Sequence, residues 1–130
     1  MRVMEMTTSL TYLAWTSALC IVLWLPYVLE RIISRGLIPV LRYEESDVEP
    51  AGWAQRCHRA HLNLLENLPP FAALVLIANL TDVGVAGAAA VFFWARVAHA
   101  IVHIAGMPYL RTAAFFVSWA AMFSVFFSVI

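Results

Sequence analysis

The sequence is poor in charge and contains no lysine. Only 12% of its 130 residues are charged and 63% are hydrophobic, a balance that excludes an ordinary water-soluble domain of this size. All eight basic residues are arginine, the cation that makes fixed, paired contacts to carboxylates, unless a compositional bias of the genome explains the choice. The formal net charge is zero, so the charge balance gives no indication of a nucleic-acid partner.

Cysteine is scarce as well. Cys20 and Cys57 are the two cysteines, and they form no CxxC motif, so a disulfide-rich domain is excluded and both are predicted to be free thiols. The sequence contains no internal repeat and no low-complexity segment. Its length is that of a single domain, residues 1–130, and four membrane spans of about 20 residues each would use most of it.

Long uncharged runs are what the sequence does contain. Residues 10–29 form such a run, which as a helix would be about 30 Å long, the thickness of the hydrocarbon core of a bilayer. With three later apolar segments, it predicts an all-α fold, a four-transmembrane-helix bundle. The expected helices cover about residues 9–33, 53–79, 85–105 and 110–130. Residues 34–50 contain Gly36, Pro39 and an acidic cluster, and are expected to form a solvated loop.

The arginines are unevenly distributed around the predicted spans. The ends next to the first and third loops carry Arg31, Arg35, Arg42, Arg56, Arg59 and Arg111, whereas the termini and the second loop carry only Arg2. Because basic loops stay on the cytoplasmic side, the termini are expected on the non-cytoplasmic side. Simple interfacial anchoring is one interpretation of Arg56, Arg59 and Arg111, and a binding site for an anion is the other.

The second predicted helix carries a polar stripe. Arg59, Asn63 and Glu66 recur at positions i, i+4 and i+7 and therefore share one helix face. An ionisable residue within a span costs roughly 2.5 to 3.5 kcal/mol, so this face is expected to point into the bundle. His61 is offset from the stripe and is predicted to pack between helices, and His58 is predicted to be interfacial.

The third predicted helix carries a second polar stripe, formed by Arg96, His99 and His103 at positions i, i+3 and i+7. Arg96 and Glu66 are candidates for a buried ion pair, and hydrogen bonding between the helices is a purely structural alternative. His99 and His103 are also spaced so that they could present two imidazoles to a metal ion, although the nearby arginines would repel a cation.

These residues resemble a known family. The segment from Arg56 to Phe71, Arg-Cys-His-Arg-Ala-His-Leu-Asn-Leu-Leu-Glu-Asn-Leu-Pro-Pro-Phe, is followed by Arg-Val-Ala-His from Arg96 and then by Arg111. This pattern is similar to the membrane-associated proteins in eicosanoid and glutathione metabolism, the MAPEG family, over about residues 9–124. The resemblance implies a homotrimer in which glutathione binds between helices of neighbouring subunits, near the cytoplasmic face.

The resemblance also implies roles for individual residues. The expected cofactor-binding residues, for glutathione, are Arg59, Asn63, Glu66, Arg96, His99, His103 and Thr112. Arg111 matches the family's thiolate-stabilising arginine at the start of the fourth helix and is the expected catalytic residue. A guanidinium there would stabilise the thiolate and direct it towards an electrophilic lipid or a hydroperoxide that enters from the bilayer.

The sequence also departs from the eicosanoid-synthesising branch of that family. Leu62 stands in place of an arginine, and His103 and Phe115 stand in place of tyrosines. A specialised prostaglandin or leukotriene synthase is therefore not expected. The compact length is typical of a bacterial-type member in the bacterial inner membrane, with a broad glutathione transferase or peroxidase activity. The alternative is a noncatalytic trimeric membrane protein that binds a lipid or an anionic metabolite in the same cavity.

Overall fold

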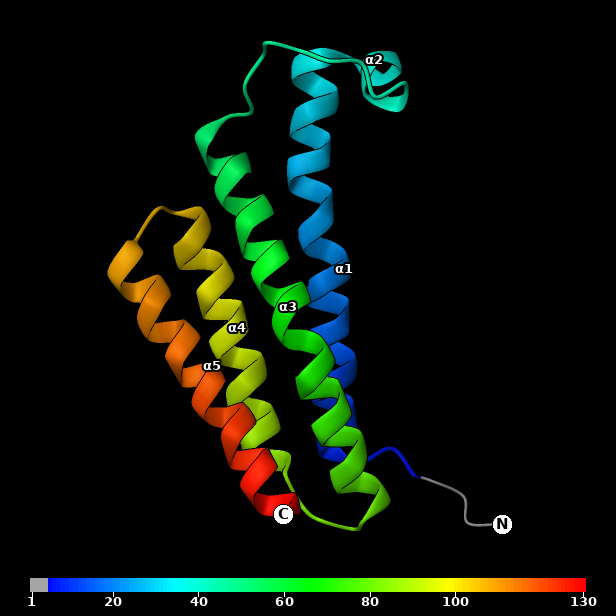
Figure 1. Cartoon of the computed structure of the whole chain (residues 1–130), viewed down its shortest axis with the longest axis vertical. Helices are drawn as coiled ribbons and strands as arrows, with labels where there is room; N and C mark the ends of the chain where they lie inside the picture. Colours follow the sequence, from blue (N-terminus) through cyan, green and yellow to red (C-terminus); the bar gives the residue numbers. More distant parts are fainter. Residues whose placement is uncertain (1–4) are drawn as a thin grey trace.

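The computed structural model describes residues 5–130, and the regular elements in this part of the chain are all helices. The four long ones run up and down beside one another (Figure 1): α1 (Thr8–Arg35), α3 (Gly52–Leu80), α4 (Ala86–Ile104) and α5 (Pro108–Val129). Each is long and apolar enough to cross a membrane, so the predicted all-α fold with four membrane-crossing helices is confirmed. Arg2 lies outside the described residues.

Caps at both ends of α1 fix its length at 28 residues. At its start, the Thr7 side chain accepts a hydrogen bond from the backbone N–H of Leu10 at 3.2 Å, which caps the first turn. At its end, Gly36 adopts a φ of +92°, and its N–H donates to the carbonyl of Ile32 at 2.8 Å. Arg35 in the last turn is favoured there by the helix dipole.

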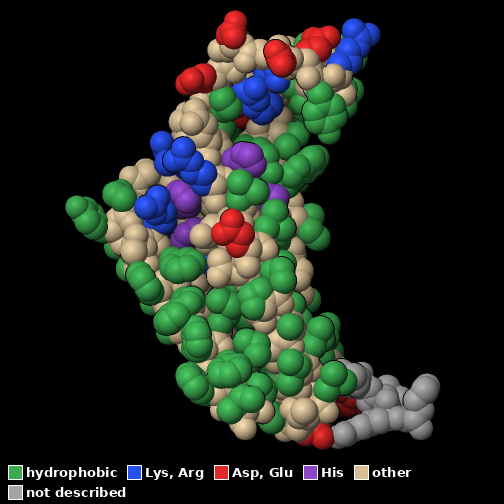
Figure 2. Space-filling view, in the orientation of Figure 1, with side chains coloured by type: hydrophobic (Ala, Val, Ile, Leu, Met, Phe, Trp, Pro, Cys, Tyr) green, Lys and Arg blue, Asp and Glu red, His purple; other side chains and the backbone are tan. Residues whose placement is uncertain are grey.

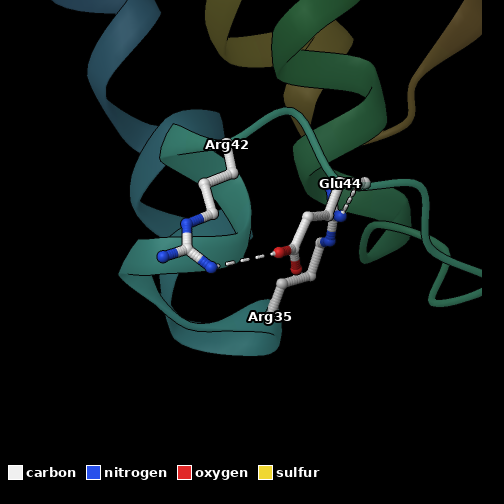
Figure 3. Close-up of polar contacts among 3 residues, drawn as sticks. All are labelled: Arg35, Arg42 and Glu44. Atoms are coloured by element: carbon white, nitrogen blue, oxygen red, sulfur yellow. Dashed lines mark hydrogen bonds and ion pairs between the residues drawn. The ribbon is translucent and has the colours of Figure 1, made fainter.

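The connection between α1 and α3 contains a short fifth helix, α2 (Leu37–Leu41), where the sequence suggested a loop without structure of its own. Arg35 donates a hydrogen bond to the backbone carbonyl of Glu44, and the Arg42 guanidinium lies 3.8 Å from the Glu44 carboxylate (Figure 3). The Arg42–Glu44 pair is exposed, so it contributes little to stability. These contacts fold the segment after α2 back towards the end of α1.

The centre of the bundle is formed by close packing of aromatic and small side chains. The Phe71 and Phe92 rings stack between α3 and α4 with centroids 3.8 Å apart, and both residues are fully buried. Ala89 and Ala121 belong to the same cluster and let α4 and α5 approach closely. Since lipid provides no hydrophobic driving force between helices, this packing is what holds them together.

The two ends of the bundle differ in charge. The end of α1, the start of α3 and the turn between α4 and α5 lie at the same end, which we call the arginine-rich end because it carries Arg31, Arg35, Arg42, Arg56, Arg59 and Arg111. In the view of Figure 2, basic and histidine side chains gather in this half of the molecule together with most of the acidic ones, and hydrophobic side chains dominate the visible surface of the other half. We call the other end, where α1 begins and α5 finishes, the opposite end.

Candidate functional site

A groove of about 390 Å³ opens among α3, α4 and α5 in the arginine-rich half. It is lined by Arg59, Leu62, Asn63, Glu66, His99, His103, Arg111, Thr112 and Phe115. The structure therefore brings together every residue expected to bind the cofactor or to act in catalysis except Arg96, which reaches the groove indirectly through Asn63. Residues of α3, α4 and α5 therefore meet in one groove.

Arg96 is a fully buried cation beside this groove. It is 1% exposed, and one of its terminal nitrogens donates to Asn63 Oδ1 at 2.6 Å. The other terminal nitrogen lies 3.4 Å from Ser118 Oγ, and its Nε is buried without a partner among the described residues. The predicted buried pair between Arg96 and Glu66 is wrong. Asn63 occupies the position facing Arg96, so the Glu66 carboxylate, about one turn further along α3, is left exposed at the groove.

The contact with Arg96 fixes the orientation of the Asn63 amide. A guanidinium has only donors, so the atom that Asn63 presents to Arg96 must be its oxygen. The NH2 group of Asn63 is thereby turned away from Arg96 and is free to donate to a ligand in the groove. A carbonyl or carboxylate oxygen is the acceptor that such a donor selects.

The two histidines of the second stripe lie edge to face in the wall of the groove. His99 and His103 are 3% and 7% exposed, and their ring centroids are 5.3 Å apart. Neither ring nitrogen of His103 has a hydrogen-bond partner within residues 5–130. In the same part of the chain, no three histidine, cysteine or acidic side chains are grouped so that they could hold a metal ion.

The comparison with protein families decides between the classes of membrane protein that such a bundle could represent. The sequence pattern of the MAPEG family matches residues 9–130, nearly the whole chain. The chain belongs to the MAPEG family. No curated protein sequence matches it. As a MAPEG protein with four candidate spans, it is a multi-pass integral membrane protein of the eicosanoid and glutathione metabolism type.

The groove of this MAPEG protein contains charges of both signs that do not neutralise each other. In the part of the chain that the structure describes, neither Arg59 nor Arg111 forms a salt bridge, and Glu66 forms none either. Guanidinium groups that line a groove and form no salt bridge favour an anion. An exposed carboxylate in the same groove favours a cationic group, so the arrangement suits a ligand that carries both charges.

Other side chains singled out in the sequence lie outside the groove, where His61 is buried and His58 is exposed. His61 lies with its Nδ1 2.9 Å from the Tyr27 hydroxyl, which confirms that it packs between helices. His58 stacks on the same Tyr27 ring, with centroids 4.6 Å apart. Cys20 and Cys57 are both buried and free, as predicted.

Three residues of the site region were not predicted as site residues. Leu62 and Phe115 contribute apolar area to the groove, and Ser118 contacts Arg96 below it. Ser118 lies seven residues after Arg111, so the two share one face of α5, and this spacing was the available signal. α5 also contains Ser124 and Ser128, so the residue type alone did not single out Ser118.

Proposed function

We propose that this MAPEG protein is a glutathione-dependent membrane enzyme that conjugates glutathione to hydrophobic electrophiles or reduces lipid hydroperoxides. In conjugation, the thiolate forms a carbon–sulfur bond as a leaving group departs or as an activated double bond accepts the electrons. In hydroperoxide reduction, two thiols give a disulfide, an alcohol and water. The observation that carries the proposal is the groove that Arg59, Arg111 and an exposed Glu66 line without a salt bridge to any residue of the described chain.

The groups of glutathione match the groups of the groove. Its carboxylates suit the Arg59 guanidinium and the NH2 group of Asn63, which Arg96 orients. Its α-ammonium suits the Glu66 carboxylate. The apolar side chains of Leu62 and Phe115 provide a surface for a hydrophobic second substrate in the same groove. Charged and apolar substrates therefore meet in one place.

Arg111 is the residue that would activate the sulfur. It lies in the first turn of α5, where the positive end of the helix dipole adds to its own charge. A thiol reacts as the thiolate, and a fixed cation beside it increases the thiolate fraction. Thr112 follows it in the groove wall, with its hydroxyl donating to the carbonyl of Pro108 at 3.0 Å.

The assembly and orientation belong to the same proposal. We infer a homotrimer in which each groove lies at the boundary between neighbouring subunits, as the family resemblance implies. We also infer a location in the bacterial inner membrane, with the arginine-rich end on the cytoplasmic side, because basic residues near span ends are retained there. A native mass in detergent that corresponds to three subunits supports this assembly, and a monomer contradicts it.

The experiment that tests the proposed function is a titration of the purified protein with glutathione in detergent, followed by the ultraviolet absorbance of the thiolate. We expect a saturable thiolate signal in the wild type and its loss in Arg111→Gln. Arg42→Gln is the matched control, because Arg42 is an exposed arginine at the same end of the bundle and does not line the groove. A wild type without a signal, or an Arg111→Gln variant that keeps it, contradicts the proposal.

One observation favours a second candidate, a noncatalytic protein that binds a lipid or an anionic metabolite. Phe115 gives the groove no hydroxyl, and the Thr112 hydroxyl is already bonded to the backbone, so few hydroxyl donors face the ligand. Saturable binding of glutathione or of an acidic lipid, without a thiolate signal and without turnover of a reactive electrophile, would establish this function in place of the first.

A further inference from the structure

The turn between α4 and α5 leads directly to the arginine proposed to activate the sulfur. α4 ends at Ile104 and α5 begins at Pro108. The backbone N–H of Arg111 donates to the carbonyl of Met107 at 3.0 Å, so Arg111 is part of the first turn of α5 and follows any movement of this connection. The contacts that hold the turn therefore also decide where the Arg111 guanidinium lies.

The end of α4 has hydrogen-bond partners for all four of its last carbonyl groups, which an α-helix leaves without partners of its own. Three of them accept from backbone N–H groups of the turn: Ile101 from Ala105 at 3.0 Å, Val102 from Met107 at 2.9 Å and His103 from Gly106 at 3.1 Å. The fourth, the carbonyl of Ile104, accepts from a side chain of another helix, Arg56 Nε of α3, at 2.8 Å. Because the helix dipole favours a cation at this end, Arg56 is a cap of α4 that α3 supplies.

Two glycines leave the space in which the Arg56 side chain lies. Gly106 in the turn has a φ of +81°, and a Cβ there would be 3.4 Å from Arg56 Nε and 3.5 Å from its Cζ. At Gly52, one turn before Arg56 in α3, a Cβ would be 3.3 Å from Arg56 Nη1. The guanidinium therefore lies close to the backbone of both α3 and the turn.

The charges near the turn oppose the position that it takes. Arg56, Arg59 and Arg111 line one cavity of about 190 Å³, and within the described chain no acidic side chain lines it with them. Since like charges repel, these guanidinium groups favour a wider spacing of α3 and α5. The bond from Arg56 to the Ile104 carbonyl acts against this repulsion, because it attaches the turn to the helix that carries Arg59.

We propose that Arg56 is a positioning residue, which ties the turn to α3 through the Ile104 carbonyl and thereby holds Arg111 beside the glutathione sulfur. The inference rests on the proposed function and deepens it: Arg111 acts on the sulfur, and Arg56 acts through the turn. The alternative is that Arg56 stabilises the thiolate through its charge alone. The two differ in the result expected when the turn is altered and the charge of Arg56 is kept.

The test is a pH titration of the thiolate absorbance of bound glutathione, on the whole protein in detergent. Losing the contact moves Arg111 away from the sulfur, so the thiolate should form at a higher pH. We expect a midpoint about 1 pH unit higher, a tenfold change in ionisation, in Arg56→Gln and in Gly106→Ala, which strains the turn but keeps the arginine. The double variant should shift no further than either single variant, since both break one contact. Arg42→Gln and Gly84→Ala, whose Cβ would have nothing within 4 Å, should titrate as the wild type does.

The titration overturns the inference if the midpoint of Arg56→Gln is unchanged. A shift in Arg56→Gln beside a wild-type midpoint in Gly106→Ala also overturns it and assigns Arg56 to charge alone. Additive shifts in the double variant show that Gly106 acts independently, with the same consequence. If the melting temperature shows that Arg56→Gln is not folded, Arg56→Lys takes its place, because it keeps the charge and loses the Nε donor. A shift in Arg56→Lys supports the inference, and a wild-type midpoint overturns it.

Hydrogen exchange, followed by mass spectrometry, gives a second readout that does not need glutathione. The backbone amides of residues 105–111 should exchange faster in Arg56→Gln than in the wild type or in Arg42→Gln, because the turn loses a contact. If the wild type gives no thiolate signal but this exchange depends on Arg56, the proposed function fails and the positioning contact stands. Equal exchange in Arg56→Gln and the wild type overturns the inference itself.

Discussion

The two ends of the bundle contain cavities of nearly equal size but opposite hydrogen-bonding character. The groove at the arginine-rich end has a volume of about 390 Å³, and a pocket at the opposite end, which Thr7, Ser9 and Asn79 help to line, has a volume of about 360 Å³. At the opposite end, the Thr7 hydroxyl donates to Asn79 Oδ1 at 2.6 Å, and Asn79 Nδ2 donates to Ser9 Oγ at 2.9 Å. Size therefore does not distinguish a binding site from a structural one in this molecule.

The difference lies in whether the polar atoms already have partners. Within residues 5–130, the buried side-chain atoms without a partner belong to Glu30, Arg96 and His103, and none of these residues lines the pocket at the opposite end. A closed network links helices, and each of its hydrogen bonds contributes about 0.6 kcal/mol in a membrane protein. An open set of donors favours a ligand instead.

The largest difference between the two ends is expected when Arg111, the cation proposed to lie beside the glutathione sulfur, is removed. We expect Arg111→Gln to lower the rate of glutathione conjugation by about 10²- to 10³-fold, as for the loss of a group that stabilises developing or bound negative charge. Chlorodinitrobenzene is a suitable electrophile for the assay. The matched variant Asn79→Ala, at the opposite end, should stay within about twofold of the wild type, because no residue of that network enters the groove. Similar losses in both variants would contradict the distinction.

The next largest effect is expected at Arg96, which acts on the ligand through Asn63. Arg96→Met removes the donor that orients the amide, so the affinity for glutathione should fall about 10-fold, the equivalent of one hydrogen bond of about 1.4 kcal/mol. The stability of the bundle should not fall, because the change removes a buried cation that no carboxylate neutralises in the described chain. Ser118→Ala, which loses only a contact of 3.4 Å, should have a smaller effect. Calorimetry and unfolding in mixed micelles measure the two quantities.

A smaller effect, on stability alone, is expected at the opposite end. Asn79→Ala removes the hydrogen bonds that connect the end of α3 to Thr7 and Ser9, which should lower the free energy of unfolding by about 1 kcal/mol. Glutathione affinity should be unchanged. If this variant bound glutathione more weakly than Arg96→Met, the opposite end would not be a purely structural network.

The smallest effect is expected from an exposed ion pair outside both cavities. Arg42→Gln removes the exposed pair with Glu44, whose separation is 3.8 Å, and should change stability by less than about 0.5 kcal/mol. Unfolding in mixed micelles and glutathione binding should both match the wild type. A loss of glutathione binding in this variant would show that arginines outside the groove contribute to glutathione binding, and not only those that line it.

The fold was predictable because four long apolar segments separated by short polar ones have few alternative arrangements in a membrane. The short helix α2 was not predicted, because a five-residue segment with Pro39 in its centre carries no periodic pattern. Helical periodicity also identified the faces that carry Arg59, Asn63 and Arg96. It could not set the register between α3 and α4, which is why the partner of Arg96 was predicted to be Glu66 and is Asn63 in the structure.

The position of Arg56 at the turn between α4 and α5 could not be predicted from the sequence for a related reason. The fixed position of Arg56 depends on the backbone of the turn after α4, in particular on the Ile104 carbonyl and on Gly106. The absence of a hydrogen-bond partner for His103 within residues 5–130 depends on every side chain around it. Neither fact follows from the spacing of residues within a single helix.

The most direct measurement is a structure of the protein in lipid nanodiscs with glutathione, determined by electron cryomicroscopy. The account predicts density for the tripeptide in the groove, with its sulfur nearest the Arg111 guanidinium and a carboxylate on Arg59. An empty groove, with Arg59 and Arg111 turned outwards and each neutralised by a lipid phosphate, would contradict it.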